Sequence, residues 1–241
     1  MIALITPTGA RPKQIQLAAE WMRKQTYKGE VLWVLVDDAV PITTDFIPVD
    51  FRENWQIIRC YPRPKWEHGQ NTQKRNLLVA VNVIEKYDNI EYIFIIEDDD
   101  YYTPDYIDTM ISKLKGHVAA GQINTVYFNI GSGTMKIFPN KAHSSLFQTA
   151  IHFSQLPMLK RILTNDADKF IDIRLWKELQ NSKINLFNGD NLSIGIKGLP
   201  GRAGIGTGHR MKGREMSFEL KKQTLKKLIG DGVFHYLELI V

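Results

Sequence analysis

The first half of the sequence alternates short apolar runs with longer segments whose apolar residues recur every three or four positions. The short runs predict buried strands, and the periodic segments predict amphipathic helices. We expect strands at 2–6, 31–36, 57–61 and 92–96 and helices at 12–26, 72–87 and 104–114. Strands that alternate with helices in this way are typical of a parallel sheet with crossover helices.

The second half has a weaker pattern. We expect strands at 125–130 and 146–153 and helices at 157–163, 168–179 and 215–229. Residues 198–213 are rich in glycine and predict a loop, and prolines make 39–70 largely irregular. Because neither a repeat nor a linker interrupts the chain, the sequence predicts a single α/β domain over 1–241.

Composition narrows the class of protein. Of the 241 residues, 44% are hydrophobic and 24% are charged, which is ordinary for a globular protein and excludes a disordered chain. The single cysteine, Cys60, excludes an internal disulfide and a multi-cysteine zinc site. The N-terminus lacks a signal-peptide pattern, and no apolar run reaches the ~18 residues of a membrane span. We therefore expect a cytoplasmic protein without an integral membrane segment.

Four consecutive acids, Glu97 to Asp100, follow the apolar run at 92–96, and Asp37 and Asp38 follow the run at 31–36. In open α/β sheets, ligands bind beyond the carboxyl ends of the strands. Adjacent carboxylates repel one another, and Mg²⁺ or Mn²⁺ relieves this repulsion because these hard cations prefer oxygen ligands. The competing interpretation is a solvated acidic turn at the start of the next helix, where negative charge is also favoured.

Residues 93–100, with the sequence Ile-Phe-Ile-Ile-Glu-Asp-Asp-Asp, resemble the DxD motif of GT-A glycosyltransferases. The polar segment 71–76, the opening Thr6-Pro7-Thr8 and the strand end at Asp37-Asp38 are also similar to that family. The resemblance implies a GT-A (Rossmann-like) fold, with a mixed, mostly parallel sheet flanked by helices. It further implies that 1–110 bind a nucleotide-diphosphate sugar, with a UDP-sugar expected first, and that 111–241 bind the acceptor.

The resemblance also implies roles for single residues. Asp100 would be the main ligand of a Mn²⁺ or Mg²⁺ ion, with Asp98 as a second ligand or ribose contact and His209 joining from the glycine-rich loop. Asp168 or Asp172 would be the general base that activates an acceptor hydroxyl. The residues implied at the donor are Thr6, Pro7, Thr8, Arg11, Asp37, Asp38, Arg75, Asp98 and Asp99.

Two other functions stay open at this point. A nucleotidyltransferase would release pyrophosphate and would carry a glycine-rich basic segment after the first strand, of which 8–13 are a faint version. A non-catalytic nucleic-acid-binding protein would use the net charge of +5 and the lysine-rich segment 215–229. A transferase acting on a hydroxylated base in DNA, rather than on a glycan, would combine the acidic cluster with this positive charge.

Overall fold

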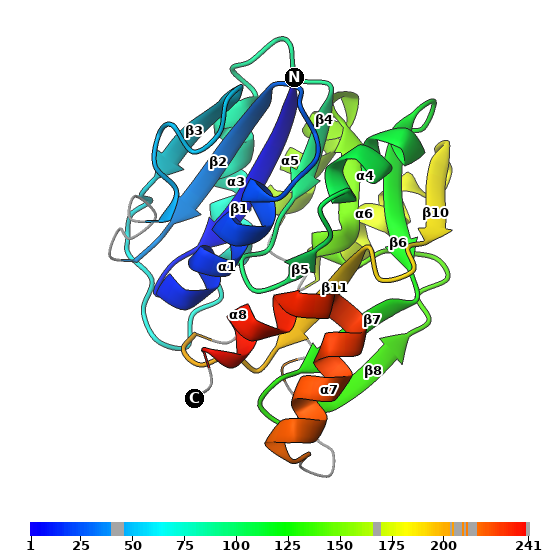
Figure 1. Cartoon of the computed structure of the whole chain (residues 1–241). Helices are drawn as coiled ribbons and strands as arrows, with labels where there is room; N and C mark the ends of the chain where they lie inside the picture. The colour runs from blue at the N-terminus through cyan, green and yellow to red at the C-terminus, as the bar shows by residue number, and fades with distance from the viewer. Residues whose placement is uncertain are drawn as a thin grey trace.

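The structure is a computed structural model of the chain, and it describes residues 1–39, 46–165, 170–202, 204, 209, 211 and 216–239. Its centre is a seven-stranded sheet with helices on both faces (Figure 1). In spatial order the strands are β10 (Ile184–Asn188), β6 (Ala119–Ile123), β9 (Thr149–His152), β4 (Tyr92–Ile95), β1 (Ile2–Thr8), β2 (Val31–Asp37) and β3 (Trp55–Cys60). Neighbouring strands are parallel except at β9, which is antiparallel to β4 and to β6. The predicted mixed, mostly parallel α/β fold is therefore confirmed.

Helices connect the strands much as their periodicity predicts. Pro12 begins the first helix, where its missing N–H group costs nothing. None of the helices in the described part of the chain is long and apolar enough to cross a membrane. The helices around the main sheet are α1 (Pro12–Arg23), α3 (Gln73–Ile84), α4 (Tyr106–Leu114), α5 (Leu156–Thr164) and α6 (Ile171–Leu179).

Both faces of the central strands are buried. Successive side chains of a strand point to opposite faces. Leu4 and Trp33 belong to the core under α1 and α4, and Ile5 and Val34 belong to the core under α3, α5 and α6. All four side chains are fully buried. A strand covered on both faces needs an unbroken apolar run, which is why the sequence predicts β1, β2 and β4 so directly.

A second, four-stranded sheet comes mostly from the latter half of the chain. Its strands are, in order, β5 (Tyr101–Tyr102), β11 (Ser193–Lys197), β7 (Thr125–Asn129) and β8 (Thr134–Phe138). The sequence predicts only β7 among these. It also makes the strand at 146–153 too long, because Leu146–Gln148 form a 3₁₀ turn before β9.

Two C-terminal helices, α7 (Phe218–Ile229) and α8 (Val233–Leu237), lie beside this second sheet (Figure 1). Tyr236 of α8 stacks on Trp21 of α1 at 5.9 Å between ring centroids. Its hydroxyl accepts a hydrogen bond from Trp21 Nε1 at 3.1 Å and donates one to the Asp99 carbonyl oxygen at 3.2 Å. The end of the chain therefore supports the acidic turn that follows β4.

The parallel pairing of β1 with β2 and β4 brings three strand ends to one edge of the sheet. Thr8, Asp37 and the acids 97–100 lie at these ends. The same edge is where an open α/β sheet binds its ligands. The topology thus assembles polar groups that are far apart in the sequence into one place.

Trp176 packs α6 against the main sheet, and its replacement by alanine tests this packing. The side chain is 1% exposed and its Nε1 donates to Thr149 Oγ1 at 3.2 Å. We expect Trp176→Ala to lower the free energy of unfolding by about 3–5 kcal/mol, because a large cavity opens. Urea denaturation measures this. The neighbouring exposed Lys177→Ala is the control, and an equal loss in both variants would contradict the packing.

Candidate functional site

The acidic turn between β4 and β5 is almost completely buried. Asp98, Asp99 and Asp100 are 1%, 2% and 0% exposed, whereas the side chain of Glu97 is 19% exposed. A solvated acidic turn would expose these carboxylates, so this burial removes that interpretation. Buried charges are tolerated when they are paired, and the pairing differs from one acid to the next.

Asp98 faces β1 and the start of α1. Its Oδ2 accepts a hydrogen bond from Thr8 Oγ1 at 2.6 Å, and its Oδ1 lies 2.8 Å from Arg11 Nη1. Arg11 also donates through Nη2 to Asp99 Oδ2 at 2.6 Å. Burial raises the pKa of Asp98 to about 6, although Arg11 opposes this rise. Thr8, Arg11, Asp98 and Asp99, all expected at the donor, therefore do lie together.

Lys197, the last residue of β11, is a site residue that the sequence pattern does not predict. It is 5% exposed, and its Nζ lies 2.7 Å from Asp100 Oδ1 and 3.0 Å from Asp100 Oδ2. The same Nζ lies 3.3 Å from Asp99 Oδ1 and 3.4 Å from Glu97 Oε2. A lysine that ends an apolar strand is the signal in the sequence, but only the pairing of β11 with β5 brings it to the acids.

The pKa values of Asp99 and Asp100 are shifted in opposite directions in this cluster. Burial raises the pKa of Asp100 well above its usual range, with Lys197 opposing the rise. Burial would also raise the pKa of Asp99, but Lys197 and Arg11 outweigh it and lower that pKa below its usual range. Asp100 also accepts a hydrogen bond from the Ile196 backbone N–H at 2.9 Å, which fixes its orientation.

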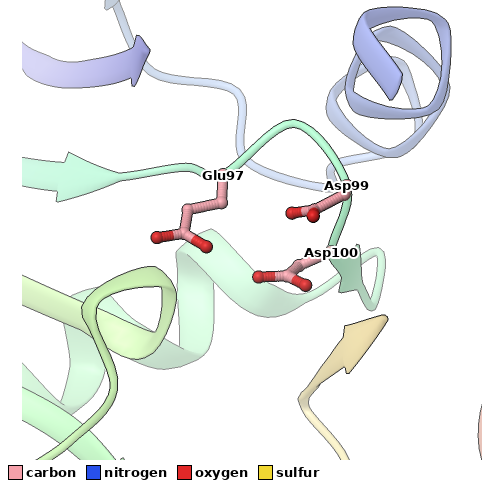
Figure 2. A group of neighbouring side chains, drawn as sticks. All are labelled: Glu97, Asp99 and Asp100. Carbon is pink, nitrogen blue, oxygen red and sulfur yellow. The ribbon is translucent and has the colours of Figure 1, made fainter. Parts of the chain in front are cut away.

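Glu97, Asp99 and Asp100 form the acidic triad, whose side chains point toward one another in Figure 2. One carboxylate oxygen from each lies within 4.8 Å of the other two, so the triad can hold a metal ion. Three hard oxygen donors fit Mg²⁺ or Mn²⁺ chemically. Asp98, expected as a ligand beside Asp100, instead faces Thr8 and Arg11.

Asp38 anchors a separate network at the end of β2. Arg202 donates to its Oδ1 at 2.7 Å, and Arg75 and Asn76 donate to its Oδ2 at 3.1 and 2.8 Å. Thr72 also donates to Oδ2. Burial alone would raise the pKa of Asp38, but the hydrogen bonds from Arg202, Thr72 and Asn76 lower it. Both carboxylate oxygens are thus already held by protein groups.

Two other residues expected at the donor point into the fold. Thr6 is fully buried, and its Oγ1 accepts from Trp33 Nε1 at 3.0 Å. Asp37 is 1% exposed, and its Oδ1 accepts from the Ala39 backbone N–H at 3.2 Å. These contacts shape the ends of β1 and β2.

A first cavity of about 90 Å³ lies over the ends of β1 and β4. Six of the residues that the sequence predicts at the functional site line this cavity, so the fold brings them together. The predicted residues that line it are Pro7, Thr8, Arg11, Asp98, Asp99 and His209, and they are joined by Asn76 and Arg202.

A second cavity of about 310 Å³ adjoins the first, since Gln73, Glu97, Gly204 and His209 line both. Its lining includes four aromatic side chains, those of Tyr127, Phe138, Phe147 and Phe170.

Asp172, at the start of α6, also lines the second cavity. Burial raises the pKa of Asp172 above its usual range. His209 lies where the two cavities meet, and burial, with a contribution from Lys197, lowers its pKa to about 4. Its imidazole is therefore neutral at pH 7, the form that ligates a metal. Asp168 lies outside the described residues.

No protein-family model and no curated protein sequence matches this chain. Solved structures do match its fold. Staphylococcus aureus TarS 1-349 in complex with UDP-GlcNAc gives a TM-score of 0.58 at 13% identity, covering 95% of this chain and 71% of that one. The complex of the same fragment with UDP gives a TM-score of 0.58 at 13% identity, covering 81% and 60%.

The match to TarS itself has a TM-score of 0.56 at 13% identity, and it covers 81% of this chain but 36% of TarS. The chain therefore spans about a third of the length of TarS. At this identity the likeness concerns the fold, and it agrees with the GT-A-like α/β architecture described above.

Proposed function

We propose that this protein is a glycosyltransferase that moves a sugar from a UDP-sugar to an acceptor hydroxyl. One observation carries the proposal: the first cavity joins the ends of β1 and β4 to the acidic turn, within a fold that in TarS holds UDP and UDP-GlcNAc. A sugar donor that bridges the first and second cavities would bring its anomeric carbon to their junction, beside Glu97 and His209.

The donor's nucleoside diphosphate occupies the first cavity in this proposal. Pro7 and Thr8 line this cavity, and Arg11 and Arg202 provide positive charge for the phosphates. Asp38 acts indirectly, because its carboxylate orients Arg202 and Arg75 rather than facing the cavity. Both arginines would be misdirected without it.

The acidic triad is the proposed metal site, and Mn²⁺ or Mg²⁺ is the proposed ion. Asp100 and Asp99 are its main ligands, Glu97 completes the set, and the neutral imidazole of His209 lies in the adjoining wall. When bound, such an ion stabilises negative charge on the departing diphosphate. Asp98 keeps a different role: it holds Arg11 and Thr8 in position at the donor.

Asp172 is the proposed general base, and the second cavity is the proposed acceptor site. The Asp172 carboxylate takes the proton from the acceptor hydroxyl while the hydroxyl oxygen bonds to the anomeric carbon of the donor. At the same time, the bond from this carbon to the diphosphate oxygen breaks. The raised pKa of Asp172 makes it a stronger base than an exposed aspartate. A glycan or a hydroxylated base in DNA offers such a hydroxyl, and the net charge of +5 favours the polyanion.

Donor binding tests the first part of the proposal. We expect UDP with Mn²⁺ to raise the melting temperature of the protein, and EDTA to abolish this rise, since a ligand that binds the folded state stabilises it. Asp100→Asn should lose most of the shift, while the exposed Asp105→Asn should keep it. Stabilisation that is the same with and without metal would contradict the metal site, and no stabilisation by UDP would contradict the donor.

The role of Asp172 predicts a separate effect on turnover. Asp172→Asn should slow the release of UDP from the donor by about 10²–10⁴-fold and leave UDP binding unchanged, because only the proton acceptor is lost. Glu178→Gln, at a surface ion pair on the same helix, is the matched control. Below neutral pH the wild-type rate should fall at a higher pH than the ordinary pKa of aspartate, since burial raises that of Asp172. A variant that turns over at the wild-type rate would remove Asp172 from the mechanism.

A further inference from the structure

Lys197 already occupies the centre of the acidic triad. Its Nζ lies within 3.4 Å of a carboxylate oxygen of Glu97, Asp99 and Asp100, the same three residues that can hold a metal ion. The shortest contact, 2.7 Å, is to Asp100. This ammonium group therefore sits where a divalent ion would bind.

An ion and this ammonium cannot share the position. Mg²⁺ lies about 2.0–2.1 Å from its oxygen ligands. Lys197 Nζ lies 2.7 and 3.0 Å from the two Asp100 oxygens, so an ion bound to the same oxygens would lie next to this ammonium group. Two neighbouring cations repel strongly in a buried site. Binding of the ion requires Lys197 to move.

The surroundings favour this exchange. Four carboxyl groups, of residues 97 to 100, face two cationic side chains, Arg11 and Lys197, so the acidic groups outnumber their cationic partners. Lys197 also lines the second cavity, of about 310 Å³, which offers room for its flexible side chain. Its Nζ already lies 5.5 Å from the Phe147 ring and 5.9 Å from the Tyr127 ring on that side.

We infer that Lys197 is a displaceable resident cation: it holds the acidic triad together before an ion binds, and Mn²⁺ or Mg²⁺ enters by moving its ammonium group off Asp99 and Asp100 toward the second cavity. The inference rests on the proposed metal site. It makes Lys197 a positioning residue that sets the affinity of the triad for the ion, and it couples the ion to the acceptor side of the site.

The affinity for Mn²⁺ tests the exchange directly. Isothermal titration calorimetry with MnCl₂ alone, without nucleotide, compares the wild-type protein with Lys197→Met. We expect the variant to bind Mn²⁺ roughly tenfold or more tightly, because the competing positive charge is gone. The matched control is Lys160→Met, which removes a lysine that pairs with Glu85 on the surface and should leave the affinity unchanged.

The outcomes separate the inference from the proposed metal site. Equal or weaker binding by a folded Lys197→Met, in a wild-type protein that does bind Mn²⁺, would overturn the exchange alone. No binding of Mn²⁺ by either protein would overturn the metal site and the exchange together. Stabilisation by UDP is measured separately, so a protein that binds UDP but no Mn²⁺ would keep the proposed donor site and lose the metal site.

A measurement on the wild-type protein covers the case in which Lys197→Met does not fold. Nitrogen-15 NMR of the lysine ammonium groups detects a buried, ion-paired Lys197, whose protons exchange slowly with water. Titration with MgCl₂ should shift or broaden this resonance at the concentration at which Mg²⁺ binds, while exposed lysines keep theirs. A Lys197 resonance that stays unchanged at saturating, calorimetrically verified Mg²⁺ would overturn the exchange.

Discussion

The rest of the site depends on the pairing of the acidic turn, in which Asp98, Asp99 and Asp100 are buried, with two cationic side chains. Arg11 reaches Asp98 and Asp99 from the turn before α1, and Lys197 reaches Asp99 and Asp100 from the end of β11. Removing one partner of a buried ion pair typically costs 3–5 kcal/mol, because the other charge is left uncompensated. The acidic turn therefore fixes the positions of segments almost two hundred residues apart in the chain.

These ion pairs also arrange the site for its proposed chemistry. Asp98 and Arg11 belong to the wall of the first cavity, and Lys197 belongs to the wall of the second. Glu97, the most exposed of the four acids, lines both. The acidic turn thus lies between the space proposed for the donor and the space proposed for the acceptor. A change in its charge would alter the electrostatic potential in both cavities.

The elements that can be predicted from the sequence are those whose local hydrophobic pattern matches their burial in the fold. The runs at β1, β2 and β4 are apolar because both faces of these strands are covered, and the acids that follow lie at a ligand-binding edge by topology. The positions of Thr8, Arg11, Asp98 and Asp99, the residues proposed to bind the donor, follow from this arrangement. Their grouping in one cavity could therefore be anticipated from the sequence.

The remainder depends on long-range pairing that a local pattern does not encode. β11 is short and contains Gly195, which lies against Tyr127 of β7. Its partners, β5 and β7, are about 90 and 70 residues away in sequence, so neither the strand nor the approach of Lys197 to Asp100 can be deduced from periodicity. For the same reason, the sequence does not show that both carboxylate oxygens of Asp38 accept hydrogen bonds, because one of the donors, Arg202, comes from a distant segment.

A crystal structure of the protein soaked with UDP and MnCl₂ would show whether the acidic triad holds the ion, because the anomalous signal of manganese locates it without assumptions about its ligands. We expect a manganese peak between Asp99 and Asp100, the diphosphate in the first cavity beside Thr8 and Arg11, and Lys197 Nζ withdrawn from the triad. A manganese peak away from the acidic triad, or a diphosphate bound outside the first cavity, would contradict it.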